Sequence, residues 1–513
     1  MVGNEQPLTL YVPATALPGS TKAEVKIYPT LIARLLDAMQ ALLQRPYDCA
    51  EQSISSAYPN LLFLKAVRRG GIHDTPLEQR AKRNLEAGYE RLLGYQSDDG
   101  GFRYWASVEP DAALAVYALQ FMADAKEFIE VTDDRITQAQ VWLKRQTLTK
   151  DAVGTLTLWG LVTAAGHADP DIDRRLGEFA RSATEFEDPY AMAAFALAAM
   201  DAGHADLAES SVRRLCELAR NEEGMAYWAF RTNTPFHGWG RAGQVETTAL
   251  VLSALAKWRK LGRGGSELQQ VIDRGALFLL RNTDASGAWS TSQSTVRALL
   301  ALLEAPATSP PNAPANVDIL FNGSGAGRIA LSEQRSKISG PATFDLSRLV
   351  RPGASNNLSI RTEGSELIQL QLTTTWYEPW TKSHSAKDFG METEFGTTRA
   401  AVNQAVTCRV KIIRPAFRGY GMMIAEIGLP PGAEADRGTL ESILNDAKSG
   451  VDSFEVAPDH ITFYVWPRAS DSNFQFVFRP RFPMEGRMAQ SALYDYYNPD
   501  EAVVLVPSEF SVN

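Results

Sequence analysis

Cys49 and Gln52 are three positions apart at the start of an apolar, helix-like segment. Residues at i and i+3 are neighbours on one face of a helix, so the Cys49 thiolate would reach the side-chain carboxamide carbon of Gln52. Loss of ammonia would then leave an internal thioester, an activated acyl group that amines, hydroxyls and water can open. The same spacing also arises by chance, in which case Cys49 is a half-buried core thiol and Gln52 a surface amide.

The other two cysteines do not indicate a disulfide framework. Cys216 and Cys408 lie in apolar runs far from Cys49 in the sequence, and three widely separated cysteines do not make a set of disulfides. Unpaired cysteines are among the most buried residue types, so both are expected to be small core side chains.

Few other residue patterns suggest chemistry. The six histidines are scattered without metal-ligand spacing, and the sequence has no Gly-x-Ser-x-Gly elbow. Asp98 and Asp99 stand at a loop tip, where paired carboxylates of carbohydrate-active enzymes perform acid catalysis. Because Gly100 and Gly101 follow them, the pair also fits a simple turn. We therefore expect no metal and no cofactor other than the internal thioester, with a glycan-processing enzyme as an alternative.

The elements that carry these residues indicate a multidomain protein of mixed α and β structure. Apolar residues recur every three or four positions from about residue 30 to residue 304, which predicts about twelve helices in six hairpins. This repeat favours an α/α toroid, a closed ring of inner and outer helices, although a long solenoid would also fit. Alternating patterns predict strands before this region and, after a Pro-rich linker, a β-sandwich over residues 384–513.

Charge and hydropathy exclude some partners. The chain has 51 Lys and Arg against 60 Asp and Glu, a formal net charge of −9, without a basic patch. Nucleic-acid binding requires clustered basic residues and is not expected. No run of about 18 apolar residues occurs, so no membrane span is expected. The first residues contain no signal segment and have the character of an internal start of a longer protein.

The sequence around Cys49 resembles a family signature. Pro46-Tyr47-Asp48-Cys49-Ala50-Glu51-Gln52 is similar to the Pro-Tyr-Gly-Cys-Gly-Glu-Gln of the alpha-2-macroglobulin and complement thioester family. Asp48 and Ala50 replace two glycines. The change at Ala50 is mild, whereas Asp48 places a carboxylate beside the site. Further similar segments are 96–102, 245–250, 289–295 and the Tyr-rich 492–501.

The resemblance implies a domain order and a shield for the thioester. Residues 1–29 and 306–383 would form a discontinuous CUB-like β-sandwich, residues 30–305 the thioester-containing toroid, and residues 384–513 a macroglobulin-type, receptor-binding-like sandwich. Apolar side chains from the toroid and the last domain would keep water from the thioester. By position, the candidates are Phe102, Tyr104, Trp105, Met422, Met423, Tyr464, Tyr496 and Tyr497, each of which also fits ordinary core packing.

The resemblance also implies a function. It indicates the C-terminal part of a broad-range protease inhibitor, extracytoplasmic and of bacterial type, that traps targets covalently in a single-use event without turnover. Lysine amines of target proteases or other proteins would attack Gln52, and the remaining macroglobulin domains of the parent would supply the trigger. Residues 146–151 lack the histidine that complement-type members use for hydroxyl transfer, so amines should be preferred.

Two further expectations concern receptor contacts and an alternative function. Of the family's receptor-contacting lysines, the expected C-terminal helix offers only Lys448. A complement-like surface-tagging protein or an adhesion protein is the second alternative. A free Cys49 would indicate an adhesion module that has lost its thioester, or the glycan-processing enzyme.

Overall fold

The protein is described by a computed structural model that places most of the chain in two compact units. The described residues are 8–29, 33–34, 36–38, 49–70, 75–105, 108–165, 169–181, 186–230, 233–284, 287–305, 316–330, 340–362, 369–380, 383–386, 389–413, 422–446, 448–466, 471–496 and 498–513. The first unit comprises Met1–Phe236 and Ala242–Glu378, and the second comprises His237–Arg241 and Pro379–Asn513.

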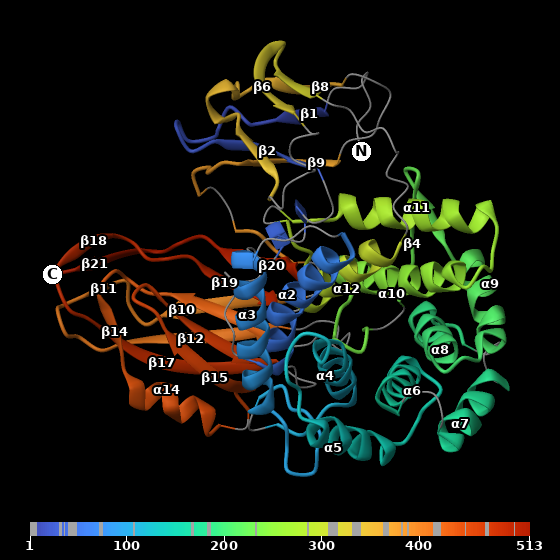
Figure 1. Ribbon diagram of the computed structural model, residues 1–513. Helices are drawn as coiled ribbons and strands as arrows, with labels where there is room; N and C mark the ends of the chain where they lie inside the picture. The colour runs from blue at the N-terminus through green and yellow to red at the C-terminus, as the bar shows by residue number, and fades with distance from the viewer. Residues whose placement is uncertain are drawn as a thin grey trace. The chain divides into compact units, whose positions relative to one another are not determined.

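The first unit contains a long helical region (Figure 1). Its helices are α2 (Ala50–Gly70), α3 (Thr75–Leu93), α4 (Ala112–Ala125), α5 (Asp133–Lys144), α6 (Ala152–Ala165), α7 (Pro170–Arg181), α8 (Pro189–Asp201), the short 3-10 helix η2 (Ala205–Ala208), α9 (Glu209–Glu217), α10 (Gly240–Lys260), α11 (Ser266–Arg281) and α12 (Ser292–Glu304).

The helices alternate between two burial patterns. The even-numbered helices are buried on nearly every side, as in α8, where every residue from Pro189 to Met200 is buried. The odd-numbered helices bury one stripe, as in α7, where the buried residues are Ile172, Leu176 and Phe179. A stripe at spacings of three and four is the pattern of a helix that covers a core from outside. The even helices are therefore the inner ones.

The first four inner helices pack on one another in order, and the last inner helix packs against the first. α2 contacts α4, α4 contacts α6, and α6 contacts α8, while α12 packs against α2. Small residues allow this close approach, since a Cβ at Gly160 of α6 would lie 2.6 Å from a methyl carbon of Val116 in α4. The described helical region therefore ends beside the helix with which it begins (Figure 1).

A hairpin that the sequence analysis did not predict interrupts the helices. β3 (Arg220–Glu222) pairs with β4 (Met225–Tyr227). The two residues between them, Glu223 and Gly224, have φ values of 48° and 77°. Positive φ at both central positions is the geometry of a two-residue hairpin turn.

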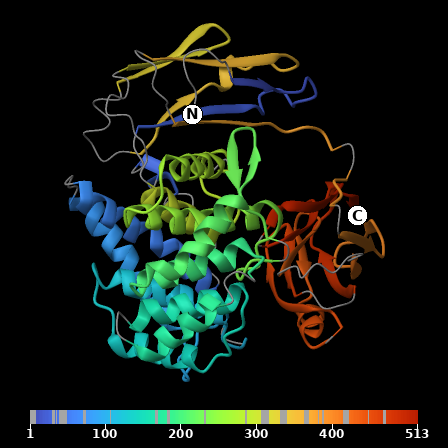
Figure 2. The ribbon, with the colours of Figure 1, turned by 90° about the vertical axis from the view of Figure 1, so that its right-hand side faces the viewer.

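The β part of the first unit combines strands from both sides of the helical region. One sheet has the order β1-β8-β5-β6 and the other β7-β2-β9. Their bounds are β1 (Leu8–Tyr11), β2 (Lys22–Tyr28), β5 (Asn316–Phe321), β6 (Ser324–Ala330), β7 (Ala342–Asp345), β8 (Ser355–Thr362) and β9 (Gln369–Thr375). Figures 1 and 2 show the blue N-terminal strands among the yellow and orange later ones. Val25, Phe321 and Leu358 belong to one core shared by the two sheets.

The second unit consists of three sheets and one described helix, α14 (Arg437–Leu444). The sheet orders are β10-β12-β17-β14, β15-β16-β13-β19-β20 and β11-β21-β18. The bounds are β10 (Gly390–Phe395), β11 (Arg399–Ala400), β12 (Val406–Ile413), β13 (Met423–Gly428), β14 (Ala433–Ala435), β15 (Val451–Val456), β16 (His460–Val465), β17 (Ser472–Pro480), β18 (Met484–Arg487), β19 (Ser491–Asp495), β20 (Asn498–Leu505) and β21 (Glu509–Val512).

One cysteine, Cys408, lies in the core of the second unit. Cys408 of β12 is fully buried there, as expected, and burial raises the pKa of its thiol to about 12. Cys216, at the end of α9, is only half-buried against the helical core. Lys448 lies beyond the end of α14 rather than within it. Among the described helices, none combines the length and apolarity that crossing a bilayer requires.

Candidate functional site

Cys49 occupies the cap position of α2 and Gln52 lies in its first turn. The Cys49 carbonyl accepts the backbone N–H of Ser53 at 3.0 Å, which starts the helical ladder. The Cys49 Sγ accepts the backbone N–H of Gln52 at 3.5 Å. A cap side chain that accepts from the third helical N–H is the usual arrangement at a helix start. Here the accepting atom is sulfur.

This cap geometry suits the formation of a Cys–Gln bond. In a capping box, the side chain of the third helical residue turns back toward the cap residue. Gln52 is that third residue and Cys49 is the cap. The turn is shielded from water, since Cys49 is 1 % exposed and Gln52 8 % exposed.

An aromatic loop lies directly against this turn. The backbone N–H of Ala50 donates to the carbonyl of Tyr104 at 3.0 Å. Phe102 and Tyr104 are buried, and the rings of Tyr104 and Trp105 are 5.7 Å apart. Three of the shield residues predicted from the sequence therefore belong to a loop that touches the Cys49–Gln52 turn.

Glu51 points into a buried polar network below the turn. Its carboxylate accepts the Ser55 hydroxyl at 2.6 Å and the Ser292 hydroxyl at 3.1 Å to each oxygen. Ser55 and the Tyr117 hydroxyl are 3.0 Å apart. Burial and then the charge of Glu51 raise the pKa of Tyr117. Glu51 is only 3 % exposed, so these hydroxyls replace the water that its charge has lost.

A second buried carboxylate lies among the inner helices. Glu246 of α10 is 1 % exposed, and its carboxylate accepts the Thr234 hydroxyl at 2.5 Å. Burial raises the pKa of Glu246 to about 7, while the nearby Arg297 opposes this shift. Arg297 of α12 donates to Gln120 of α4 at 3.0 Å. The interior of the helical region is therefore charged at several points.

The shield candidates of the second unit occupy different environments. The backbone N–H of Tyr496 donates to the carbonyl of Met422 at 2.9 Å, which brings the end of β19 beside the start of β13. Met423 belongs to the core of that unit. Tyr464 is half-buried, and its hydroxyl donates to Glu455 at 2.9 Å. Tyr497 lies outside the described residues.

The Tyr-rich C-terminal segment has a buried carboxylate at its centre. Asp495 is fully buried and accepts the indole N–H of Trp239 at 3.1 Å and the backbone N–H of Asn498 at 3.1 Å. The Asn498 side chain in turn accepts the backbone N–H of Trp239 at 3.1 Å. The segment 492–501, which was singled out from the sequence, contains Asp495. Its partner Trp239 was not predicted, because the two positions are far apart in the chain.

Asp98 and Asp99 form an exposed turn. The Ser97 hydroxyl donates to Asp99 at 2.5 Å, and this hydrogen bond lowers the pKa of the Asp99 carboxyl. A general acid requires a raised pKa, so Asp99 does not have the character of a catalytic acid. The backbone hydrogen bond from Gly100 to Ser97, at 2.9 Å, closes the turn.

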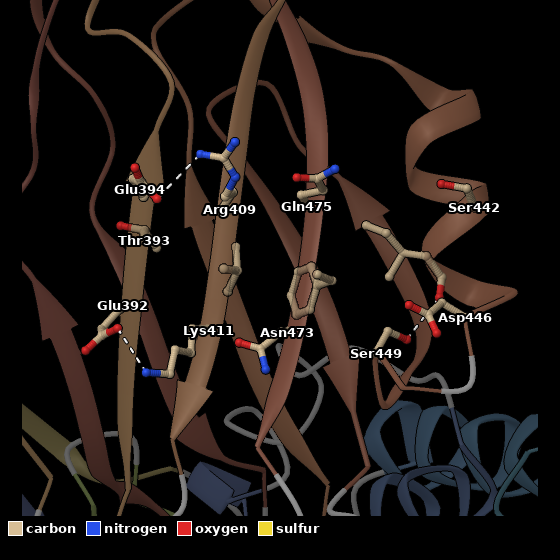
Figure 3. Close-up of a pocket in the computed structure, with 13 residues that line it drawn as sticks. Glu392, Thr393, Glu394, Arg409, Lys411, Ser442, Asp446, Ser449, Asn473 and Gln475 are labelled. Carbon is tan, nitrogen blue, oxygen red and sulfur yellow. Dashed lines mark hydrogen bonds and ion pairs between the residues drawn. The ribbon is translucent and has the colours of Figure 1, made fainter.

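The second unit also carries an open groove of about 590 Å³ on one sheet face, beside α14 (Figure 3). Glu392 pairs with Lys411 and Glu394 with Arg409, each at 3.5 Å. In each pair the two opposite charges neutralise each other. Such exposed cross-strand pairs are typical of a solvated sheet face. None of the groove residues belongs to the predicted site.

Pro46, Tyr47 and Asp48 of the predicted signature lie outside the described residues. Within the described part of the chain, no group of three or more His, Cys, Asp or Glu could hold a metal ion. Ser292 was missed as a site residue, although segment 289–295 was singled out. Its link to Glu51 spans 241 positions and has no local signal.

Comparisons with known proteins agree on one family. The model of the A-macroglobulin TED domain matches residues 22–153 and 171–304. The model of the A-macroglobulin receptor binding domain matches residues 419–506.

Individual relatives are distant. Ovostatin of Gallus gallus is 20 % identical over 97 % of this chain, which spans 35 % of the length of ovostatin. Native alpha-2-macroglobulin of Escherichia coli, solved from domain MG7 to the C-terminus, aligns with all of this chain and 81 % of its own, with a TM-score of 0.71 and 15 % identity. Salmonella alpha-2-macroglobulin reacted with methylamine covers all of this chain and 33 % of its own, with a TM-score of 0.69 and 16 % identity.

Proposed function

The chain belongs to the alpha-macroglobulin family, and we propose that it is a thioester-containing C-terminal part that traps proteins covalently through Gln52. The observation that carries this proposal is the buried first turn of α2. It places the Cys49 sulfur 3.5 Å from the backbone nitrogen of Gln52 and leaves both residues nearly inaccessible to water.

The proposed architecture is a toroid with two β-sandwiches. The alternation of inner and outer helices and the contact between α12 and α2 support a closed α/α ring. The shared core of the strands on either side of the helical region supports one discontinuous CUB-like sandwich of residues 1–29 and 306–383. The separate core of the second unit supports a macroglobulin-type sandwich of residues 384–513.

The proposed chemistry has a forming and an opening step. In the first, the Cys49 sulfur attacks the Gln52 carboxamide carbon, the C–N bond breaks, and the thiol proton leaves with the amide nitrogen as ammonia. In the second, an amine nitrogen attacks the same carbon, the C–S bond breaks, and a proton from the amine goes to the Cys49 thiolate. The products are an amide at position 52 and a thiol at position 49, so each molecule acts once.

Protection from water would decide the lifetime of this bond. Apolar groups around a reactive acyl centre lower the local water concentration. The loop of Phe102, Tyr104 and Trp105 supplies such groups on the first unit. Among the candidates of the second unit, the core position of Met423 favours ordinary packing over a covering role.

In a longer parent protein, the remaining macroglobulin domains would control exposure of the thioester. We propose that the parent is an extracytoplasmic protease inhibitor and that lysine amines of bound proteases attack Gln52. The comparison with alpha-2-macroglobulins of Escherichia coli and Salmonella favours a bacterial type. Complement-like surface tagging is the second candidate, and it would require transfer to hydroxyls.

The test of the proposed function is titration of thiols with and without methylamine under native conditions. The intact thioester predicts that Cys49 reacts with a thiol reagent only after the amine has opened the bond. A Gln52→Ala variant is the control, since it cannot form the bond. A parent chain that gains no reactive thiol when methylamine is added would overturn the proposal.

A further inference from the structure

We propose that Ser292 is a positioning residue for the thioester, acting through Glu51. This inference rests on the proposed function, because it concerns how the same turn is held. Ser292 is the first residue of α12, and Glu51 lies between Cys49 and Gln52 in the sequence. The Ser292 hydroxyl lies 3.1 Å from each oxygen of the Glu51 carboxylate.

The contact ties the reactive turn to a second helix. Ser55, which also donates a hydroxyl hydrogen bond to Glu51, is on α2 itself, one turn further along. That bond stays within α2, although the Ser55 hydroxyl is also 3.0 Å from the hydroxyl of Tyr117 in α4. The bond from Ser292 joins Glu51 directly to α12, the helix that packs against α2.

The buried Glu51 carboxylate depends on the donors around it. The carboxylate lies in the first turn of α2 and beside the first residue of α12, so it is near the positive ends of two helix dipoles. Both hydroxyl donors are buried, with Ser292 at 8 % exposure and Ser55 at 0 %. A buried carboxylate that lost one of these donors would be drawn toward water or another partner. The first turn of α2 would shift with it.

Such a shift matters because the bond needs close alignment. Attack of sulfur on a carboxamide carbon depends on sub-ångström placement of the two groups. The cap hydrogen bond from Gln52 to the Cys49 sulfur, at 3.5 Å, offers little restraint of its own, because a thiol sulfur is a weak acceptor. Fixing Glu51, the residue between them, fixes the backbone of both partners.

The experiment compares Ser292→Ala with Ser294→Ala. Ser294 is a buried hydroxyl in the same turn of α12, at 1 % exposure, and its partner is Thr291 rather than Glu51. Each chain is measured by intact mass for the fraction that lacks one ammonia, and by thiol release in amine-free buffer. Thermal unfolding checks the fold, and Ser292→Thr restores a hydroxyl at the same place.

We expect Ser292→Ala to speed thiol release about tenfold and to lower the ammonia-deficient fraction, as loss of a hydrogen bond to a charged group would. Ser294→Ala should match the parent chain. Ser292→Thr should bring the rate of thiol release and the ammonia-deficient fraction most of the way back to the parental values. Equal rates for Ser292→Ala and the parent chain would overturn the inference, as would equal acceleration by both alanine variants. If the parent chain itself lacks the ammonia deficit, the proposed function fails instead.

Discussion

At the scale of single residues, the first turn of α2 brings together a sulfur, a carboxamide and a fixed carboxylate. Cys49 caps the helix, Gln52 follows within the turn, and Glu51 turns inward to Ser55 and Ser292. The helix start supplies backbone donors and a positive dipole end. The chemistry proposed for this turn therefore depends on local helix geometry and on partners from distant segments.

Substitution of Cys49 tests the assignment of the nucleophile. A serine at position 49 keeps a cap acceptor for the Gln52 N–H but is a much weaker nucleophile than a thiolate. We expect Cys49→Ser to fold with a free energy of unfolding within about 1 kcal/mol of the parent chain. It should not incorporate radiolabelled methylamine. Incorporation at the parental level would show that the label enters at another site.

The preferred nucleophile is a second prediction at this scale. Residues 146–151 contain no histidine to carry the acyl group to a hydroxyl. We expect methylamine to open the bond far faster than glycerol at equal concentration, measured as thiol release over time. Comparable rates would favour surface tagging through hydroxyls over trapping of protein amines.

Cys49 and Gln52 could be predicted from the sequence as a candidate pair, whereas the long-range contacts of their helix turn could not. Spacing and the similar signature identified Cys49 and Gln52, and position in the sequence identified Tyr104, whose carbonyl accepts the Ala50 N–H. The partnership of Glu51 with Ser292, 241 positions away, depends on the packing of α12 on α2. No local pattern encodes a contact of that kind.

At the scale of elements, close helix packing depends on small residues at specific positions. α2 and α3 meet where a Cβ added at Gly88 would overlap the Cβ of Ala57. A Cβ added at Gly177, in α7, would meet no described atom within 4 Å. These two helical glycines provide a matched pair for testing the packing of the inner and outer helices.

Gly88→Ala and Gly177→Ala should have opposite effects on stability. Overpacking between α2 and α3 should lower the free energy of unfolding by about 1–3 kcal/mol. Gly177→Ala should raise it by about 0.5–1 kcal/mol, because alanine has the higher helix propensity. Chemical denaturation of both variants measures the difference. Equal changes would mean that α3 does not pack on α2 as described.

Periodicity predicted most elements, and the exceptions have local causes. The stripe of α7 and the largely apolar composition of α8 follow directly from their sequences. The hairpin β3–β4 was missed because its strands are only three residues long and one is fully exposed. The C-terminal helix was expected to include Lys448, whereas it begins at Arg437, with Asp436 as its cap, and ends at Leu444.

At the scale of the whole molecule, buried charges inside the helical region link stability to pH. Burial raises the pKa of Glu246 from 4.5 to about 7. Between these values, the folded chain retains a proton that the unfolded chain has lost. The contribution of Glu246 to the free energy of unfolding therefore falls as pH rises through this window and is level above it.

Glu246→Gln should remove this dependence. Between pH 5 and pH 8, we expect the parent chain to lose at most about 3 kcal/mol of unfolding free energy relative to the variant. Denaturant titrations at a series of pH values provide the comparison. Parallel curves for the two proteins would show that Glu246 has an ordinary pKa in the folded state.

The intact mass of the whole chain tests the proposed function most directly. A Cys49–Gln52 thioester predicts a mass lower than that of the sequence by one ammonia. Treatment with methylamine should then add one methylamine to that mass and release one thiol. A chain that has the full mass of its sequence when freshly purified and unexposed to amines, and that gains nothing from methylamine, would contradict the thioester.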